Sequence, residues 1–162
     1  MHIWPVLQSV LLISLANGAP VVAKKFLGAR LAFPLDAGAR FFDGQPLLGP
    51  SKTIRGVVAS VGATAVAAPL FGLSFAAGAV VALLAMIGDL FSSFVKRRLK
   101  FPSSTQAIGL DQVPESLLPL LVCKEALALT SIDVVIGVGI FVLGEMVLSR
   151  LLYDLRLRDE PY

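Results

Sequence analysis

The sequence has little charge and a single cysteine. Only 15% of its 162 residues are charged, compared with about 25% in soluble domains, whereas 56% are hydrophobic and the mean hydropathy is +0.83. This composition excludes an ordinary soluble domain and indicates an integral membrane protein. Because Cys123 lies within an apolar segment, a disulfide framework and a thiolate metal cluster are excluded, and redox chemistry is a poor hypothesis.

Long apolar runs predict an all-α, polytopic membrane protein with about five transmembrane helices. A helix needs about 20 residues to cross a bilayer, so we expect residues 1–162 to form a single membrane domain. The predicted spans are residues 3–23, 54–72, 73–95, 113–130 and 132–152. The first is predicted to be a retained helix and not a cleaved signal peptide, because Lys24 and Lys25 follow the apolar run instead of preceding it.

The distribution of cations predicts the orientation in the membrane. Two connecting loops, residues 24–53 and 96–112, are rich in lysine and arginine, and the C-terminal tail adds Arg156 and Arg158. The other junctions carry almost no cations. By the positive-inside rule, both loops and the tail are expected on the cytoplasmic face of the cell's inner (plasma) membrane, with the N-terminus outside.

A polar stripe is predicted at the end of the third span. Residues three and four apart share a helix face, so Asp89, Ser93, Lys96 or Arg97, and Lys100 line up. The cations alone are explained by anchoring to an anionic leaflet, but Asp89 has no role in such an anchor. A stripe of this kind can hold a metal ion and phosphates together.

Asp111 precedes the fourth predicted span at the same membrane face as Asp89. Two carboxylates next to a basic surface suit Mg²⁺, which takes one or two carboxylates together with substrate phosphates. The hypothesis is that Asp89 and Asp111 bind Mg²⁺. The alternative for Asp111 is a simple helix N-cap.

Two further segments combine polar groups with a helix break or a helix start. Asn17-Gly18-Ala19-Pro20 interrupts the first span, either as a break that lines a cavity or as an ordinary proline kink. Ser51-Lys52-Thr53-Ile54-Arg55-Gly56 opens the second span, where free backbone N–H groups and the helix dipole favour a phosphate. The alternative for its cations is again a membrane anchor.

These segments, in their order and spacing over about residues 16–115, resemble the CDP-archaeol synthase family. The residues that carry the resemblance are Asn17-Gly18-Ala19-Pro20, Pro34-Leu35-Asp36, Asp43-Gly44, Ser51 to Gly56, Gly88-Asp89-Leu90, Ser93 to Arg98 and Leu110-Asp111-Gln112. That family is related to the phosphatidate cytidylyltransferases (CDP-diglyceride synthetases). Their signature includes a serine, two variable residues and Lys-Arg, as at Ser93, Lys96 and Arg97 here.

The resemblance implies Mg²⁺-dependent transfer of CMP from CTP to a lipid phosphate, which yields a CDP-activated lipid for phospholipid biosynthesis and releases pyrophosphate. It implies catalytic roles for Asp89, Asp111, Lys96 and Arg97, and substrate binding by Asn17, Ser51, Lys52, Thr53, Arg55, Ser93, Arg98 and Gln112. The cations agree with this chemistry, because CTP and the lipid phosphate are both anions and positive charge is needed to screen their repulsion. A homodimer is an expectation from the family alone.

The chain departs from the family pattern after Gln112, where Val113, Pro114 and Glu115 replace an apolar residue and a second aspartate. This leaves the lipid open between an archaetidic acid-like ether lipid and phosphatidic acid. The alternative functions are a small membrane transporter, a lipid-binding subunit, or a CDP-alcohol phosphotransferase that consumes CDP-lipid. Lys124 is expected either to pair with Glu145 near the outer side or to snorkel.

Overall fold

The computed structural model describes residues 2–103, 105 and 107–154, and these residues form five α-helices and no strand. The helices are α1 (Ile3–Leu27), α2 (Ile54–Ala67), α3 (Phe75–Arg98), α4 (Gln112–Val122) and α5 (Ser131–Asp154), and a 3₁₀ helix, η1 (Ala68–Phe71), extends α2. The predicted all-α fold is therefore confirmed. Arg156 and Arg158 of the predicted basic tail lie outside the described residues.

Four of the described helices are long and apolar enough to cross a bilayer. They are Ile3–Leu27, Ile54–Phe71, Phe75–Arg98 and Ser131–Leu151, and they match the first, second, third and fifth predicted spans. Large apolar side chains such as Val58 and Leu143 are exposed on their outer faces, whereas the hydroxyls of Ser9 and Ser92 are buried and hydrogen-bonded to backbone carbonyls. This arrangement suits lipid, where polar groups must be satisfied inside the protein.

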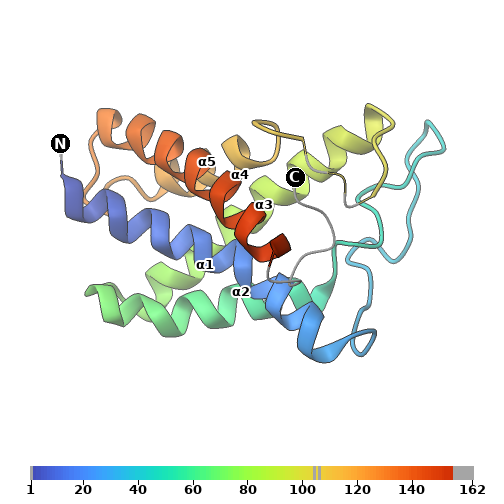
Figure 1. Cartoon of the computed structure of the whole chain (residues 1–162), viewed down its shortest axis with the longest axis horizontal. Helices are drawn as coiled ribbons and strands as arrows, with labels where there is room; N and C mark the ends of the chain where they lie inside the picture. The colour runs from blue at the N-terminus through green and yellow to red at the C-terminus, as the bar shows by residue number, and fades with distance from the viewer. Residues whose placement is uncertain (1, 104, 106, 155–162) are drawn as a thin grey trace.

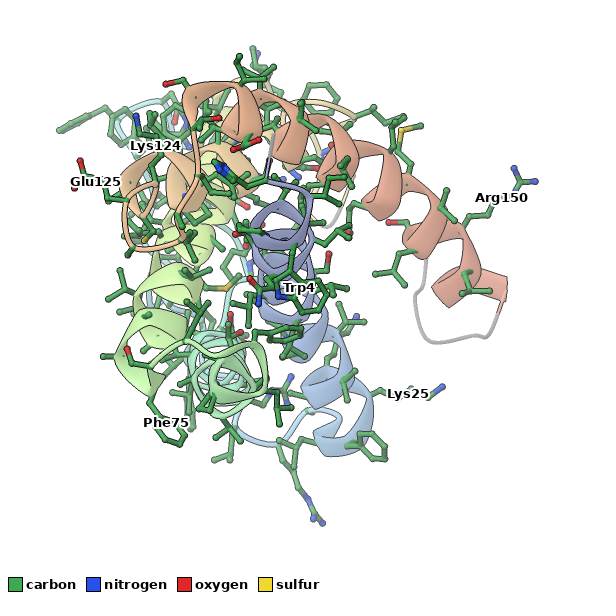
Figure 2. All side chains as sticks on the ribbon, turned by 90° about the vertical axis from the view of Figure 1, so that its left-hand side faces the viewer. Trp4, Lys25, Phe75, Lys124, Glu125 and Arg150 are labelled. Carbon is green, nitrogen blue, oxygen red and sulfur yellow. The ribbon has the colours of Figure 1, made fainter. Side chains whose placement is uncertain are left out.

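The fourth predicted span, residues 113–130, is helical only in its first part. α4 has 11 residues, which amount to about 16 Å, roughly half of a 30 Å hydrocarbon core. Beyond Val122 the chain turns, and Ala128 has a positive φ of 53°. Lys124 and Glu125 lie in these turns (Figure 2). The predicted span was too long because the irregular segment after α4 is also apolar, and hydropathy does not distinguish it from a helix.

α1 is the central helix, since it packs against α2, α3, α4 and α5. Figure 2, a view along the bundle, shows α1 end-on near the centre, with Trp4 at its near end, and α5 diverging to one side, with Arg150 far from the centre. The N-terminal ends of α1 and α5 are tied together. His2 donates its backbone N–H to Asp133 Oδ1 at 3.1 Å, and its Nδ1 lies 3.0 Å from Oδ2.

The long loop of residues 28–53 lies at the end of the bundle where α2 begins and α3 ends (Figure 1). Asp36 organises this loop, because its two oxygens accept backbone N–H groups from Gly38, Leu48 and Gly49 at 3.0, 2.9 and 3.1 Å. Partial burial alone would raise the pKa of Asp36, but these donors lower it below its ordinary value. These hydrogen bonds fix the loop, whose last residues directly precede α2.

Candidate active site

A cavity of about 480 Å³ lies among the five helices, and all of them contribute to its lining. Six of the predicted site residues line it: Asn17, Ser51, Lys52, Thr53, Arg55 and Asp89. Two carboxylates that were not predicted as site residues, Glu115 of α4 and Glu145 of α5, also line it. Segments far apart in the sequence thus place cations and carboxylates in one chamber.

Lys52 and Asp89 form an ion pair in this cavity. The Lys52 Nζ lies 2.6 Å from both Asp89 oxygens, and both side chains are about one-fifth exposed. Burial alone would lower the pKa of Lys52, but the Asp89 carboxylate outweighs it and raises that pKa above its ordinary value. Lys52 is therefore a cation at neutral pH.

The start of α2 lines the cavity. Thr53 is the N-cap, and its Oγ1 accepts the backbone N–H of Gly56 at 3.2 Å. Arg55 fixes the loop against this helix, because its Nη1 donates to the carbonyl oxygens of Gly28 and Arg30 at 2.9 and 2.5 Å. The free N–H groups and the dipole of α2 add to the positive potential of Lys52.

Asn17 and Glu115 connect α1 with α4 in the cavity wall. The Asn17 Nδ2 donates to Glu115 Oε2 at 2.7 Å, and the Glu115 carboxyl group interacts in turn with that of Asp89. The predicted interruption at Asn17 to Pro20 is wrong, because α1 continues through it with Pro20 inside the helix. The segment nevertheless lines the cavity, as one of the two predicted interpretations required.

Gly88 allows α3 and α4 to touch through their backbones. A Cβ at this position would lie 2.3 Å from the carbonyl oxygen of Pro114 and 2.8 Å from the Cα of Glu115. Such distances are far inside van der Waals contact, so a larger residue would force the helices apart. The absence of a side chain at Gly88 therefore brings Asp89 next to Glu115.

A second ion pair lies close to the first but does not line the cavity. The Lys96 Nζ is 2.7 Å from Asp111 Oδ1 and donates to the Thr105 carbonyl at 2.9 Å. Asp111 Oδ2 accepts the backbone N–H of Ala107 at 2.8 Å. Asp111 stands at the N-cap position of α4, but its side chain makes no capping hydrogen bond to the helix, so capping does not explain this carboxylate. Its charge acts on Lys52, which places the two ion pairs in one electrostatic cluster.

The remaining predicted residues have different surroundings. Ser93 and Arg97 are buried near the end of α3, and the Nε of Arg97 has no hydrogen-bond partner. Gln112 is also buried, and its Oε1 accepts the N–H of Gly109 at 2.7 Å. These residues lie next to the cluster but do not line the cavity.

Arg98 points away from the cavity and into the long loop. Its Nη2 donates to the Pro46 carbonyl at 2.6 Å, and its Nη1 lies 3.2 Å from Asp43 Oδ1. The guanidinium also lies 4.7 and 4.9 Å from the ring centroids of Phe41 and Phe94. These contacts assign Arg98 to holding the loop on α3, and nothing in the geometry supports its predicted substrate contact.

The donor set determines how a metal could bind here. In the part of the chain that the structure describes, no three His, Cys, Asp or Glu side chains are grouped to hold a metal ion. Asp89 and Asp111 offer hard oxygen donors from two helices, which fits Mg²⁺ that takes one or two carboxylates and completes its coordination with water and substrate phosphates. Both carboxylates are already paired with lysines.

Glu115 and Glu145 are the cavity residues that sequence reasoning missed. Asp111 directly precedes α4 with helical backbone angles, so its spacing of four from Glu115 puts both on one side of the helix start, and this signal could have identified Glu115. The expected pair of Lys124 and Glu145 is wrong. Glu145 is 14 residues beyond the start of α5 at Ser131, about 21 Å along the helix, whereas Lys124 lies in the turns that precede α5.

The fold and the cavity together define a polytopic membrane protein with a partly buried cluster of carboxylates and cations at one end of its helical bundle. A family profile described as "CarS-like: CDP-archaeol synthase" matches residues 5–162. Similar proteins include the CDP-archaeol synthase of Hyperthermus butylicus, 37% identical over 91% of this chain and 89% of the relative. Another is that of Pyrobaculum islandicum, 34% identical over 91% of both chains.

One similar solved structure is that of an intramembrane enzyme for archaeal membrane lipids biosynthesis. It aligns with a TM-score of 0.74 and 32% sequence identity, and it covers 87% of this chain and 90% of that chain. The chain belongs to the CDP-archaeol synthase family. The resemblance stated from the motifs is confirmed.

Proposed function

We propose that this protein is a CTP-dependent cytidylyltransferase that acts on a lipid phosphate, forms a CDP-activated lipid and releases pyrophosphate. The observation that carries the proposal is the cavity with the Lys52–Asp89 ion pair at the start of α2. The pair of Lys96 and Asp111 lies next to it. Family membership supports the same reaction.

In the proposed reaction an oxygen of the lipid phosphate attacks the α-phosphorus of CTP. A new P–O–P bond forms as the bond between the α- and β-phosphates breaks, and the electron pair leaves with pyrophosphate. No covalent enzyme intermediate is needed. Because both substrates are anions, the main task of the protein is to screen their repulsion and to align them.

The triphosphate is proposed to lie at the start of α2, where Ser51, Lys52 and Thr53 line the cavity. Lys52 supplies a mobile point charge there, and the free backbone N–H groups of the helix supply directed donors. Arg97 is proposed to bind phosphate oxygens through its guanidinium, which suits bidentate contacts. Its Nε has no partner in the structure.

Asp89 and Asp111 are the residues that would hold Mg²⁺. When bound, the ion supplies positive charge for the phosphate oxygens and for the leaving pyrophosphate. Lys96 neutralises Asp111 at 2.7 Å, which limits the negative charge that the substrate anions meet. Both carboxylates are thus proposed to serve the reaction and not only the fold.

The cavity is proposed to open toward the cytoplasm, where CTP is available. The support is the positive-inside rule, because Lys24, Lys25, Arg30, Lys96 and Lys100 belong to the segments at the cavity end of the bundle. The lipid chains would then remain among the apolar surfaces of the spanning helices. The homodimer stays a prediction from the family.

The test is pyrophosphate release by detergent-purified protein with CTP and Mg²⁺. Three reactions are compared: one with an isoprenoid ether lipid phosphate, one with a diacyl phosphatidate and one without lipid. Release that needs both lipid and Mg²⁺ is the expected result, and the lipid that gives it identifies the lipid class. Folded protein that releases no pyrophosphate with either lipid would contradict the proposal and favour a binding or transport role.

A further inference from the structure

The ammonium of Lys52 occupies the position that a divalent cation would need at Asp89. It lies 2.6 Å from both carboxylate oxygens, and carboxylates bind divalent ions through one or both of these oxygens. A lysine cation and a divalent cation cannot share this position, because they would overlap and repel each other. Asp89 can therefore hold only one of them at a time.

We propose that Lys52 is an internal counter-ion that blocks metal binding at Asp89 until the nucleotide arrives. The triphosphate then takes the ammonium from Asp89, and the freed carboxylate accepts the divalent ion. This inference rests on the proposed function, because it requires a nucleotide and a metal to meet at this pair. It couples metal and nucleotide binding through Lys52, in addition to the coupling that shared phosphate ligands already give.

The surroundings of Lys52 allow the ammonium to move while its backbone stays fixed. The backbone N–H of Lys52 donates to the Gly49 carbonyl at 3.2 Å, and its carbonyl accepts the N–H of Leu35 at 2.8 Å. The side chain lines the cavity, and its four-carbon stem has several rotatable bonds. A triphosphate at the start of α2 would lie within the same cavity as the ammonium.

Lys96 provides the contrast within the same cluster. Its side chain is 8% exposed, compared with 22% for Lys52, and a second hydrogen bond to the Thr105 carbonyl holds its ammonium at 2.9 Å. Lys96 does not line the cavity. The Lys96 ammonium contacts only Oδ1 of Asp111, so Oδ2, which accepts the Ala107 N–H, still has a lone pair for a metal ion while this pair stays fixed. The Lys52 ammonium contacts both oxygens of Asp89, so this is the pair that must exchange.

Electrostatics require Asp89 to keep a cation in every state. A buried carboxylate without a counter-ion is strongly unfavourable, so displacement of Lys52 has to be coupled to arrival of the metal. By thermodynamic linkage, the nucleotide must then raise metal affinity by the same factor as the metal raises nucleotide affinity. Metal alone should bind weakly to the unmodified protein.

The experiment measures Mn²⁺ binding to the nucleotide-free, full-length protein by the loss of the free-ion electron paramagnetic resonance signal. Lys52→Met is compared with the unmodified protein and with Lys25→Met, the same substitution at an exposed lysine that does not line the cavity. Lys52→Met is expected to bind Mn²⁺ at least about tenfold more tightly than the unmodified protein, which corresponds to about 1.4 kcal/mol. Lys25→Met is expected to match the unmodified protein.

Two more variants keep the test decisive. Lys52→Gln, whose amide can still donate to Asp89, should also tighten Mn²⁺ binding, and it replaces Lys52→Met if that variant does not fold. Lys52→Met/Asp89→Asn should lose the gain, because the carboxylate is absent. Equal Mn²⁺ affinity in the folded Lys52 variants and the unmodified protein would overturn the inference. Pyrophosphate release by the unmodified protein would then still support the proposed function, so the two failures are distinguishable.

Discussion

The Lys52 ammonium lies 2.6 Å from both carboxylate oxygens of Asp89, although 37 residues separate the two in the sequence. Lys52 ends the long loop before α2, and Asp89 lies in α3. Only about one-fifth of each side chain is exposed. The pair thus joins a loop to a helix with charges that water screens poorly. Single and double substitutions of Lys52 and Asp89 should therefore distinguish the contribution of the ion pair to stability from the role of Asp89 in the reaction.

Asp89→Asn should abolish pyrophosphate release, because the proposed site loses a carboxylate that no other described residue replaces. It also leaves Lys52 partly buried without its counter-ion, which should cost about 3–5 kcal/mol of the free energy of unfolding. Lys52→Met/Asp89→Asn should regain much of that stability but no activity. Thermal unfolding in detergent and the pyrophosphate assay together check this. A double variant no more stable than Asp89→Asn would contradict the role given to the ion pair.

Gly88→Ala should separate α3 from α4, because the new Cβ would lie 2.3 Å from the Pro114 carbonyl oxygen. We expect a loss of about 1–3 kcal/mol of the free energy of unfolding and a large loss of activity, since Asp89 and Glu115 move apart. Gly62→Ala is the matched control, because nothing lies within 4 Å of its Cβ position. Unchanged thermal stability and turnover in Gly88→Ala would show that the helices do not meet as described.

The sequence predicted much of this site because its polar residues stand out against apolar helices. Asp89 and Lys52 were predicted as parts of separate motifs, and the structure brings them together. The sequence could not reveal that Asp89 and Lys52 contact each other, because a contact between a loop and a helix follows from tertiary packing. Arg98 shows the opposite case, since its motif position suggested a substrate contact whereas Asp43 and Pro46 engage it.

The fold was predictable to a similar extent, and for a related reason. Hydropathy identifies apolar length, so it found the four long helices. It could not detect that the chain turns after Val122, because the residues that follow remain partly apolar while their backbone leaves the helix. A pair of Glu145 with Lys124 was one of two expectations for Lys124, because hydropathy gives no information on which helix faces meet.

Arg98→Lys should loosen the long loop while leaving most of the catalytic rate. Lysine cannot reproduce the contacts of the guanidinium with the Pro46 carbonyl, Asp43 and two aromatic rings. Limited proteolysis should therefore cut within residues 28–53 several-fold faster, whereas kcat should change by less than about tenfold. A collapse of kcat with unchanged proteolysis would instead indicate the substrate contact that the sequence suggested.

The loop should also open in acid. Because three backbone donors lower the pKa of Asp36 below its ordinary value of 3.8, the ionised form is favoured in the folded state. Its contribution to stability is therefore present above the ordinary pKa and is lost as the pH falls through the lower folded value. Proteolysis of residues 28–53 by an acid protease should accelerate below about pH 4. The same acceleration in Asp36→Asn would exclude Asp36 as its cause.

The reaction itself is tested most directly by following the two ends of CTP. Purified protein is given Mg²⁺ and the lipid phosphate, with CTP labelled on either its α- or its γ-phosphorus. The α-label is expected to enter the lipid fraction and the γ-label to leave as pyrophosphate, with neither transfer in Asp89→Asn. Hydrolysis of CTP without α-label in the lipid, or no turnover by folded protein, would contradict the proposed reaction.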